Sequence, residues 1–287
     1  MSLLGIFGQT VGRIATSLPG TVPGRATLWD ATTDRRGVAA LAHQSVAILG
    51  AAALLWAALL RGWLPMPQNS LDAPMTAPGV PEAMATAAGL DGVATYLLMW
   101  GVMMSAMMYP AMYPYVRGYL DGIGGGVLRQ QAALWAFFVP YSLVWTATGV
   151  VPLTVDLLVP VHDLVSAAPG AVLGVGFLAA GLHQLSSYKH RFLDHCCDCS
   201  VREVSRSLGG IARDGLAHAR SCLGCTWAPF ALMVLLGSMN PAVMLGLTLL
   251  VTLERAADRG HEVAAASGVL SVALGALCVL SGALALV

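Results

Sequence analysis

Five of the six cysteines lie in one short stretch of the chain, between Cys196 and Cys225. Within it, two Cys-x-x-Cys units, Cys196/Cys199 and Cys222/Cys225, bracket a single loop. The two-residue spacer brings both thiolates of a unit to one side of a turn, and paired units of this kind are typical of metal sites. Thiolates suit zinc, copper(I) or an iron–sulfur cluster. The spacing therefore predicts a site for a soft metal ion.

Two histidines adjoin the cysteine units. His195 directly precedes Cys196 in the chain. His218 lies four residues before Cys222, and residues four apart share one face of a helix. Both histidines are therefore candidate metal ligands beside Cys196, Cys199, Cys222 and Cys225.

Two other interpretations of the cysteines stay open. A cysteine within a membrane is also a small apolar side chain, and the Cys-Leu-Gly-Cys stretch at 222–225 suits close helix packing. A thiol pair can also carry out redox chemistry when the pKa of one thiol is low. Cys197 is a spare thiol within the cluster, and Cys278, far from it, is expected to pack.

Methionines supply a second group of soft donors, in the stretch MWGVMMSAMMYPAM at 99–112. Their spacing of four residues forms two stacks on a helix: Met99, Met103 and Met107, and beside them Met104, Met108 and Met112. Thioethers bind copper(I) without bringing charge into a bilayer. The candidate ligands in this group are Met103, Met104, Met107 and Met108, with Met239 at the far end of a later helix. The alternative is that the methionines fill an irregular core.

The elements that position these residues are predicted to be membrane-spanning helices. The chain has 287 residues, of which 57% are hydrophobic and 10% charged. A soluble domain carries about a quarter charged residues. Because about 20 apolar residues cross a bilayer, the sequence predicts an all-α polytopic membrane bundle of about seven transmembrane helices. Their expected ranges are 38–60, 93–116, 132–155, 170–188, 216–238, 241–255 and 264–286.

The basic residues set the expected orientation. With the N-terminus in the cytoplasm, every lysine and arginine except Arg61 falls on the inner side, as the positive-inside rule requires. Residues 1–37 then form a cytoplasmic N-terminal segment, and 38–287 form the transmembrane domain with a cytosolic cysteine-rich loop at 189–215. A reducing cytosol disfavours disulfides there. The expected location is the inner membrane of a bacterium.

Four local features carry further expectations. Pro110 and Pro114 should kink or end the second span. Asn240 should cap the sixth span, with Pro241 in its first turn. Residues 62–92 are a proline-rich outer loop with nothing that promises a core. The sequence Glu254–Arg255 is expected to be an ordinary pair at the inner membrane surface.

Several classes of function are disfavoured. The sequence has no Gly-x4-Gly-Lys-Ser/Thr phosphate loop, no Asp-Lys-Thr-Gly phosphorylation sequence, no Gly-x-Ser-x-Gly elbow and no His-Glu-x-x-His helix. The formal net charge of zero offers no basic surface for nucleic acid. An enzymatic role would have to come from a bound metal or from the thiols, and we expect a metal-handling or accessory protein in preference to an enzyme.

Several motifs together resemble a bacterial family of predicted metal-binding integral membrane proteins of unknown function. They cover roughly residues 90–260 and comprise Trp100-x-x-Met103-x-x-Ala106-Met107-Met108-x-Pro110, Pro140-Tyr141 with Trp145, Tyr188-Lys189, Gly215 with His218, Cys222-x-Gly224-Cys225-x-Trp227, and Met239-Asn240 with Met244 and Glu254. The resemblance implies a membrane protein that binds metal. The chain departs from it in the extra thiol of Cys197, in Arg255 where lysine is expected, and in an extended N-terminus.

These observations favour copper(I) handling, as a carrier, a chaperone or an accessory subunit of a membrane metalloenzyme. One alternative is a structural membrane subunit whose cytosolic loop is stapled by zinc; another is a membrane thiol oxidoreductase. The expected partners are the lipid bilayer and either other membrane subunits or a metal donor or acceptor protein.

Overall fold

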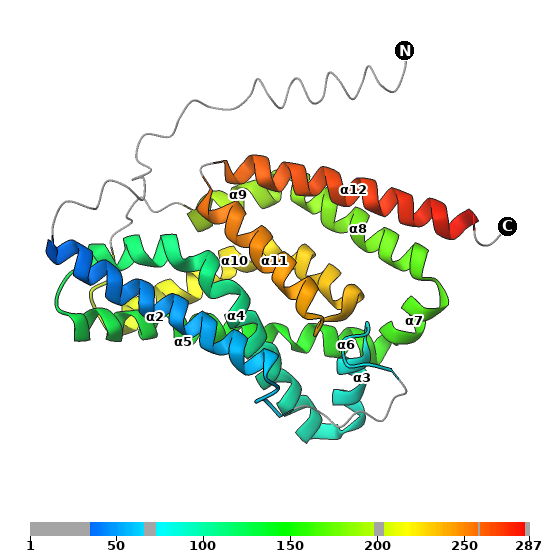
Figure 1. Cartoon of the computed structure of the whole chain (residues 1–287), viewed down its shortest axis with the longest axis horizontal. Coiled ribbons are helices and arrows are strands. Elements are labelled where there is room, and N and C mark those ends of the chain that lie inside the picture. Colours follow the sequence, from blue (N-terminus) through cyan, green and yellow to red (C-terminus); the bar gives the residue numbers. More distant parts are fainter. Residues whose placement is uncertain (1–34, 66–72, 198–203, 258, 285–287) are drawn as a thin grey trace, which may run out of the picture. The chain divides into compact units, whose positions relative to one another are not determined.

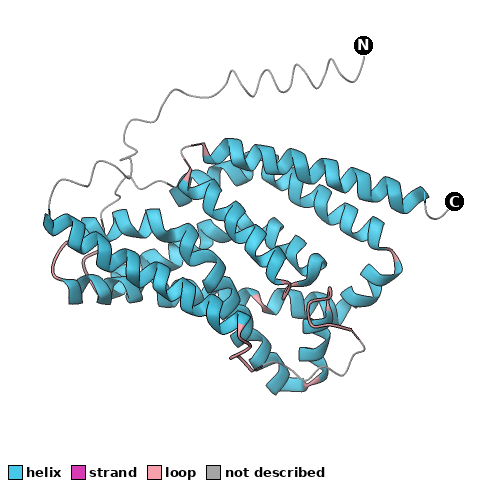
Figure 2. Ribbon diagram, viewed as in Figure 1, coloured by secondary structure: helices cyan, strands magenta, loops and turns pink. Residues whose placement is uncertain are grey.

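The computed structural model describes residues 35–65, 73–197, 204–257 and 259–284, with only the backbone described at 35–42, 197 and 284. Every regular element in these ranges is an α-helix, so the predicted all-α class is confirmed (Figure 2). The chain divides into two units, Met1–Val38 and Ala39–Val287. The core and the candidate site belong to the second unit.

Figure 1 shows the helices of the described residues in chain order. They are α2 (Arg35–Leu60), α3 (Val80–Ala87), α4 (Gly89–Ile123), α5 (Val127–Thr148), α6 (Val150–Leu158), α7 (Val161–Ala167), α8 (Pro169–Leu185), α9 (Ser187–Cys197), α10 (Leu208–Gly237), α11 (Pro241–Ala256) and α12 (Gly260–Leu284).

Helix α4 forms the centre of the core and packs against α3, α5 and α11. It does not end at its prolines, as the sequence allowed, but continues through both to Ile123. A proline inside a helix removes the hydrogen bond to the carbonyl four residues earlier. For Pro110 that carbonyl belongs to Ala106, and it accepts a hydrogen bond from the indole Nε1 of Trp56 on α2 at 3.1 Å. A side chain from a neighbouring helix thus satisfies the freed backbone group.

Glycines allow α8 and α12 to lie side by side at close range (Figure 1). A Cβ atom at Gly174 of α8 would lie 2.9 Å from the carbonyl oxygen of Gly275 of α12. A Cβ atom at Gly275 would in turn lie 2.7 Å from the carbonyl oxygen of Gly174. Small residues at matched positions are a common way for apolar helices to approach each other.

The segment 62–92 contains an element that the sequence did not promise. Helix α3 is only eight residues long, yet Val80, Glu82 and Ala85 are fully buried. The Glu82 carboxylate accepts hydrogen bonds from the hydroxyls of Tyr96, at 2.7 Å, and Ser238, at 2.8 Å. The expectation of a loop without a core is therefore wrong. A helix of this length is too short to show a clear apolar period, and it is buried by contacts with other helices, α4 and α6 above all.

The expected cap of α11 is confirmed. The side-chain oxygen of Asn240 accepts from the backbone N–H of Ala242, at 3.0 Å, and of Val243, at 3.5 Å. Pro241 occupies the first helical turn, where its missing N–H removes no helical hydrogen bond.

Five helical segments of the described chain are long and apolar enough to cross a membrane: His43–Leu60, Gly89–Ile123, Val127–Leu158, Leu208–Gly237 and Gly260–Ala283. The pair α7–α8, bent by 112° at its break, would make a sixth if it forms one span. Helix α11 has 16 residues, fewer than a typical span needs. The expected count of seven therefore stays a prediction.

Candidate metal centre

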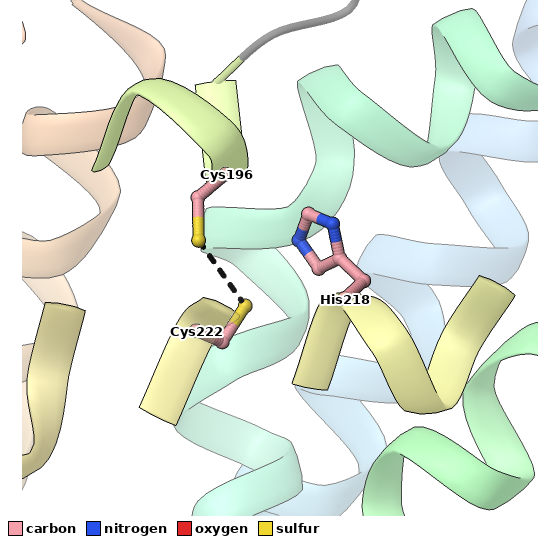
Figure 3. A group of neighbouring side chains, drawn as sticks. All are labelled: Cys196, His218 and Cys222. Atoms are coloured by element: carbon pink, nitrogen blue, oxygen red, sulfur yellow. Dashed lines mark hydrogen bonds between the residues drawn. The ribbon is translucent and has the colours of Figure 1, made fainter. Parts of the chain in front are cut away.

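Three cysteine sulfurs converge where α9 meets α10. Cys196 lies in the last turn of α9, and Cys222 and Cys225 lie on α10. The Cys196 Sγ is 3.8 Å from the Cys222 Sγ (Figure 3). It is also 3.7 Å from the Cys225 Sγ. All three side chains are buried. Three thiols drawn together from two helices form the nucleus of the site.

His218 joins these cysteines because α10 is a regular helix. Residues 218, 222 and 225 are separated by four and three positions, which places them on one face. The ligand atoms of Cys196, His218 and Cys222 all lie within 4.8 Å of one another (Figure 3). The imidazole packs against the ring of Tyr115, with centroids 4.0 Å apart. Its Nε2 is buried and has no hydrogen-bond partner among the described residues, so this nitrogen is available to a metal ion.

Gly224 allows α9 to come close enough for Cys196 to join the site. A Cβ atom at this position would lie 2.6 Å from the ring of Phe192 on α9. That ring is backed by Tyr188, with centroids 4.7 Å apart. The glycine between the two cysteines of α10 therefore sets the separation between the helices that carry the thiols.

Among the methionines, Met112 reaches the thiols. Its Sδ lies 3.7 Å from the Cys222 Sγ. The four candidates on α4 are all buried in the same core: Met103, Met104, Met107 and Met108. Met239 is partly buried at the turn between α10 and α11, where it packs against this core. The sequence placed Met112 in the second methionine stack, but its contact with Cys222 depends on how α4 packs against α10.

Arg255 is the charged residue of the site, which the sequence did not identify. Its Nη1 lies 3.2 Å from the Cys222 Sγ and 3.3 Å from the Met112 Sδ, and its Nη2 lies 3.3 Å from the Cys225 Sγ. The side chain is buried, with 6% of its surface exposed. The expectation of an ordinary Glu254–Arg255 surface pair is therefore wrong, because the last turn of α11 is covered by α9.

Glu254 instead pairs with Lys189 of α9. The Lys189 Nζ lies 2.6 Å from the Glu254 Oε2, and both side chains are almost completely buried. The amide of Gln184 on α8 donates to the other carboxylate oxygen at 2.6 Å and to Ser267 of α12 at 3.0 Å. This network joins four helices next to the thiols and keeps α9 against α11.

Among the described residues, His195 and Cys278 lie outside the cluster. His195 is exposed, and its Nδ1 is 2.7 Å from the carbonyl oxygen of Arg191. Cys199 lies outside the described residues, as does the side chain of Cys197. Cys278 is half-buried on α12. The structure thus groups Cys196, Cys222, Cys225 and His218, and it leaves the sequence-adjacent His195 at the surface.

The geometry suits one ion shared by several sulfurs. With metal–sulfur bonds of about 2.3 Å, sulfurs around a single ion lie about 3.7–4.0 Å apart, which agrees with the separations of 3.7 and 3.8 Å. Burial raises the pKa of the Cys196 thiol well above its ordinary value, and the neighbouring Cys222 and Cys225 raise it further. Because a metal binds the thiolate, loading must displace protons from this cluster.

An all-helical core with buried thiols, an imidazole and a thioether defines a protein that handles a soft metal ion. The model of the PpoB2 copper chaperone family matches residues 97–278. This match covers more than half of the chain and includes every residue of the cluster, so the chain belongs to this family. The expected relation to metal-handling proteins is confirmed, and copper is the metal that the family handles. No curated protein and no solved structure matches the chain.

Proposed function

We propose that the protein is a membrane-embedded copper(I) chaperone. It holds one copper(I) ion at Cys196, Cys222 and Cys225, with His218 and Met112 at the edge of the site, and delivers it to a partner metalloprotein. The observation that carries this proposal is the convergence of three buried sulfurs from two helices in a member of a copper chaperone family.

The donor set supports copper(I) as the cargo. Copper(I) is a soft ion, and thiolate and thioether sulfurs are the ligands that it prefers. It is stable with two or three ligands, so a thiolate of the partner can bind before a resident one leaves. The low exposure of Cys196, at 2%, and of Cys222 and Cys225, at 0%, keeps water and oxidants away from the bound ion.

The methionines of α4 supply a route to the thiols. Their side chains are buried along the helix, and the sulfur of Met112 meets that of Cys222. Neutral thioethers hold copper(I) weakly enough to pass it on, and they bring no charge into the bilayer. We place the entry near Met239 and Met244 and the tight site at the cysteines.

Exposed apolar helices support membrane integration. Helix α12 contains the most hydrophobic candidate span, with a mean hydropathy of 2.3, yet only 17% of that window is buried inside the protein. Apolar surfaces of this extent need lipid or a partner protein. With the N-terminus inside, the basic residues and the cysteine cluster lie at the cytosolic side of a bacterial inner membrane. The partners are then the bilayer and a membrane metalloprotein for which this chain acts as an accessory subunit.

A structural zinc site is the second candidate, because three cysteines and one histidine are also a common zinc donor set. Zinc–sulfur bonds of about 2.3 Å fit the observed separations equally well. In that case the ion would staple α9 to α10 and would not be transferred.

Metal content and copper(I) competition distinguish the two candidates. The protein is purified anaerobically in detergent, and its metals are measured by mass spectrometry before and after copper(I) is added in the presence of a chromophoric chelator. We expect one tightly bound copper(I) per chain in the wild type and in C278S, the matched control, and loss of this binding in C222S. Stoichiometric zinc that copper(I) does not displace, or the absence of both metals, would contradict the proposal.

A further inference from the structure

The guanidinium of Arg255 occupies an unusual position for a cation, because it contacts the sulfurs that are proposed to bind a cation. It donates to Cys222 at 3.2 Å, to Cys225 at 3.3 Å and to Met112 at 3.3 Å. The adjacent Glu254 points elsewhere, to Lys189 and Gln184. The positive charge of Arg255 is thus directed into the sulfur cluster.

A fixed positive charge at this distance acts differently on ions of different charge. Its Coulomb repulsion is proportional to the charge of the bound ion, so a divalent ion is penalised about twice as strongly as a monovalent one. The site is buried, and water screens this repulsion poorly. The same guanidinium also stabilises the thiolates. That effect is common to all ions that bind the same thiolates, and it cancels when two ions are compared.

We propose that Arg255 determines the specificity of the centre, because its permanent charge favours monovalent copper(I) over divalent zinc at the shared sulfurs of Cys222 and Cys225. This inference rests on the proposed function and adds the basis of metal selection to it.

The form of the side chain fits this role. The guanidinium directs separate N–H groups at the two cysteines, so its charge is held at a fixed distance from both sulfurs. The position is held by the buried Lys189–Glu254 pair next to it. Arg255 also lies in the last turn of α11, where the helix dipole favours a positive charge.

The test compares copper(I) and zinc affinities of the purified chain, each measured by competition with a chelator for that metal. The variants are R255Q, which removes the charge, and R255K, which keeps it. R220Q is the control, because Arg220 is an exposed residue on the helix that carries Cys222. We expect the ratio of copper(I) to zinc affinity to fall by about tenfold or more in R255Q and to stay within about threefold of the wild type in R255K and R220Q.

The readout separates specificity from a structural role, since a collapsed site lowers both affinities and leaves their ratio unchanged. If the wild type binds copper(I) and R255Q has the same ratio of copper(I) to zinc affinity, the role of Arg255 in specificity is overturned and the proposed function stands. A wild type without copper(I) affinity overturns the proposed function and this inference with it. R255L, which keeps most of the side-chain volume and adds no metal-binding atom, provides a second uncharged variant if R255Q does not fold.

Discussion

The sulfur of Met112 lies 3.7 Å from the sulfur of Cys222 and connects the methionines of α4 to the cysteine pair of α10. The two residues are 110 positions apart in the chain, and both are completely buried. This contact makes Met112 the point where a weak thioether site and a tight thiolate site meet.

Replacing Met112 with leucine tests this junction. Leucine conserves volume in a core, so the fold should tolerate M112L with little loss of stability. We expect copper(I) affinity to fall by about three- to tenfold, because one soft donor is lost from the edge of the site. Chelator competition measures this effect.

The matched variant M103L changes a buried methionine of the same helix that belongs to the neighbouring methionine stack. We expect it to keep the equilibrium affinity of the cysteine site and to slow copper(I) loading, which stopped-flow transfer from a donor complex can measure. Equal affinities and equal loading rates in the wild type, M112L and M103L would refute the thioether route.

Enlarging Gly224 tests how α9 is positioned. Alanine at this site places a methyl group 2.6 Å from the ring of Phe192, so the ring has to shift. We expect α9 to move away from α10 with the ring and to carry Cys196 with it. We expect G224A to lose copper(I) affinity by about tenfold or more, and we expect the same of a variant that removes the Cys196 thiol.

The control is G246A, at a helical glycine of α11 whose Cβ would meet no atom within 4 Å. Alanine there should stabilise the helix by up to about 1 kcal/mol and leave copper(I) affinity unchanged. A G224A protein with wild-type affinity would show that α9 does not need this close approach.

Breaking the buried Lys189–Glu254 ion pair should lower the stability of the fold strongly. In E254Q the lysine keeps its charge but loses its ionic partner, which lies 2.6 Å away in the wild type. We expect the free energy of unfolding to fall by about 3–5 kcal/mol, the usual cost of breaking a buried ion pair on one side. Equilibrium unfolding in mixed detergent micelles measures this change.

The comparison is E262Q, which breaks the exposed pair Arg259–Glu262. Exposed pairs contribute within about 1 kcal/mol, so E262Q should unfold almost like the wild type. If E254Q lowered the free energy of unfolding as little as E262Q does, Lys189 would have to find another partner or lose its proton.

Glu82 predicts a specific pH dependence of stability. Burial raises the pKa of this carboxyl above its ordinary value of 4.5, although Tyr96 and Ser238 donate hydrogen bonds to it. The folded state therefore holds the proton at pH values where the unfolded chain has released it. The stability that Glu82 contributes is complete below pH 4.5 and is lost as the pH rises through the raised native pKa.

The variant E82Q mimics the protonated acid and removes this titration. We expect its stability to decline less than that of the wild type as the pH rises above 4.5, in thermal unfolding followed by circular dichroism. E262Q again serves as the control, because it removes an exposed carboxylate. Parallel curves for the wild type and E82Q would show that Glu82 is not protonated in the folded state.

Much of the helical architecture could be predicted from the sequence alone. The shared face of His218 and Cys222 follows from helical periodicity, and the cap at Asn240 follows from the residue types at the start of the helix. These features and the apolar runs are all local properties of the sequence. Short α3 could not be predicted in this way, because its residues are buried by partners outside it, such as Tyr96 of α4 and Ser238, which follows α10.

The sequence by itself also determined the chemical type of the centre, since clustered cysteines and stacked methionines are soft donors wherever they lie. Only the tertiary structure decided which donors meet. His195 neighbours Cys196 in the chain but points to the surface, because consecutive helical residues face different directions. Met112 and Arg255 reach the sulfurs from two other helices. Helical periodicity defines the faces of a helix, but the packing of α4, α9, α10 and α11 decides which faces come together.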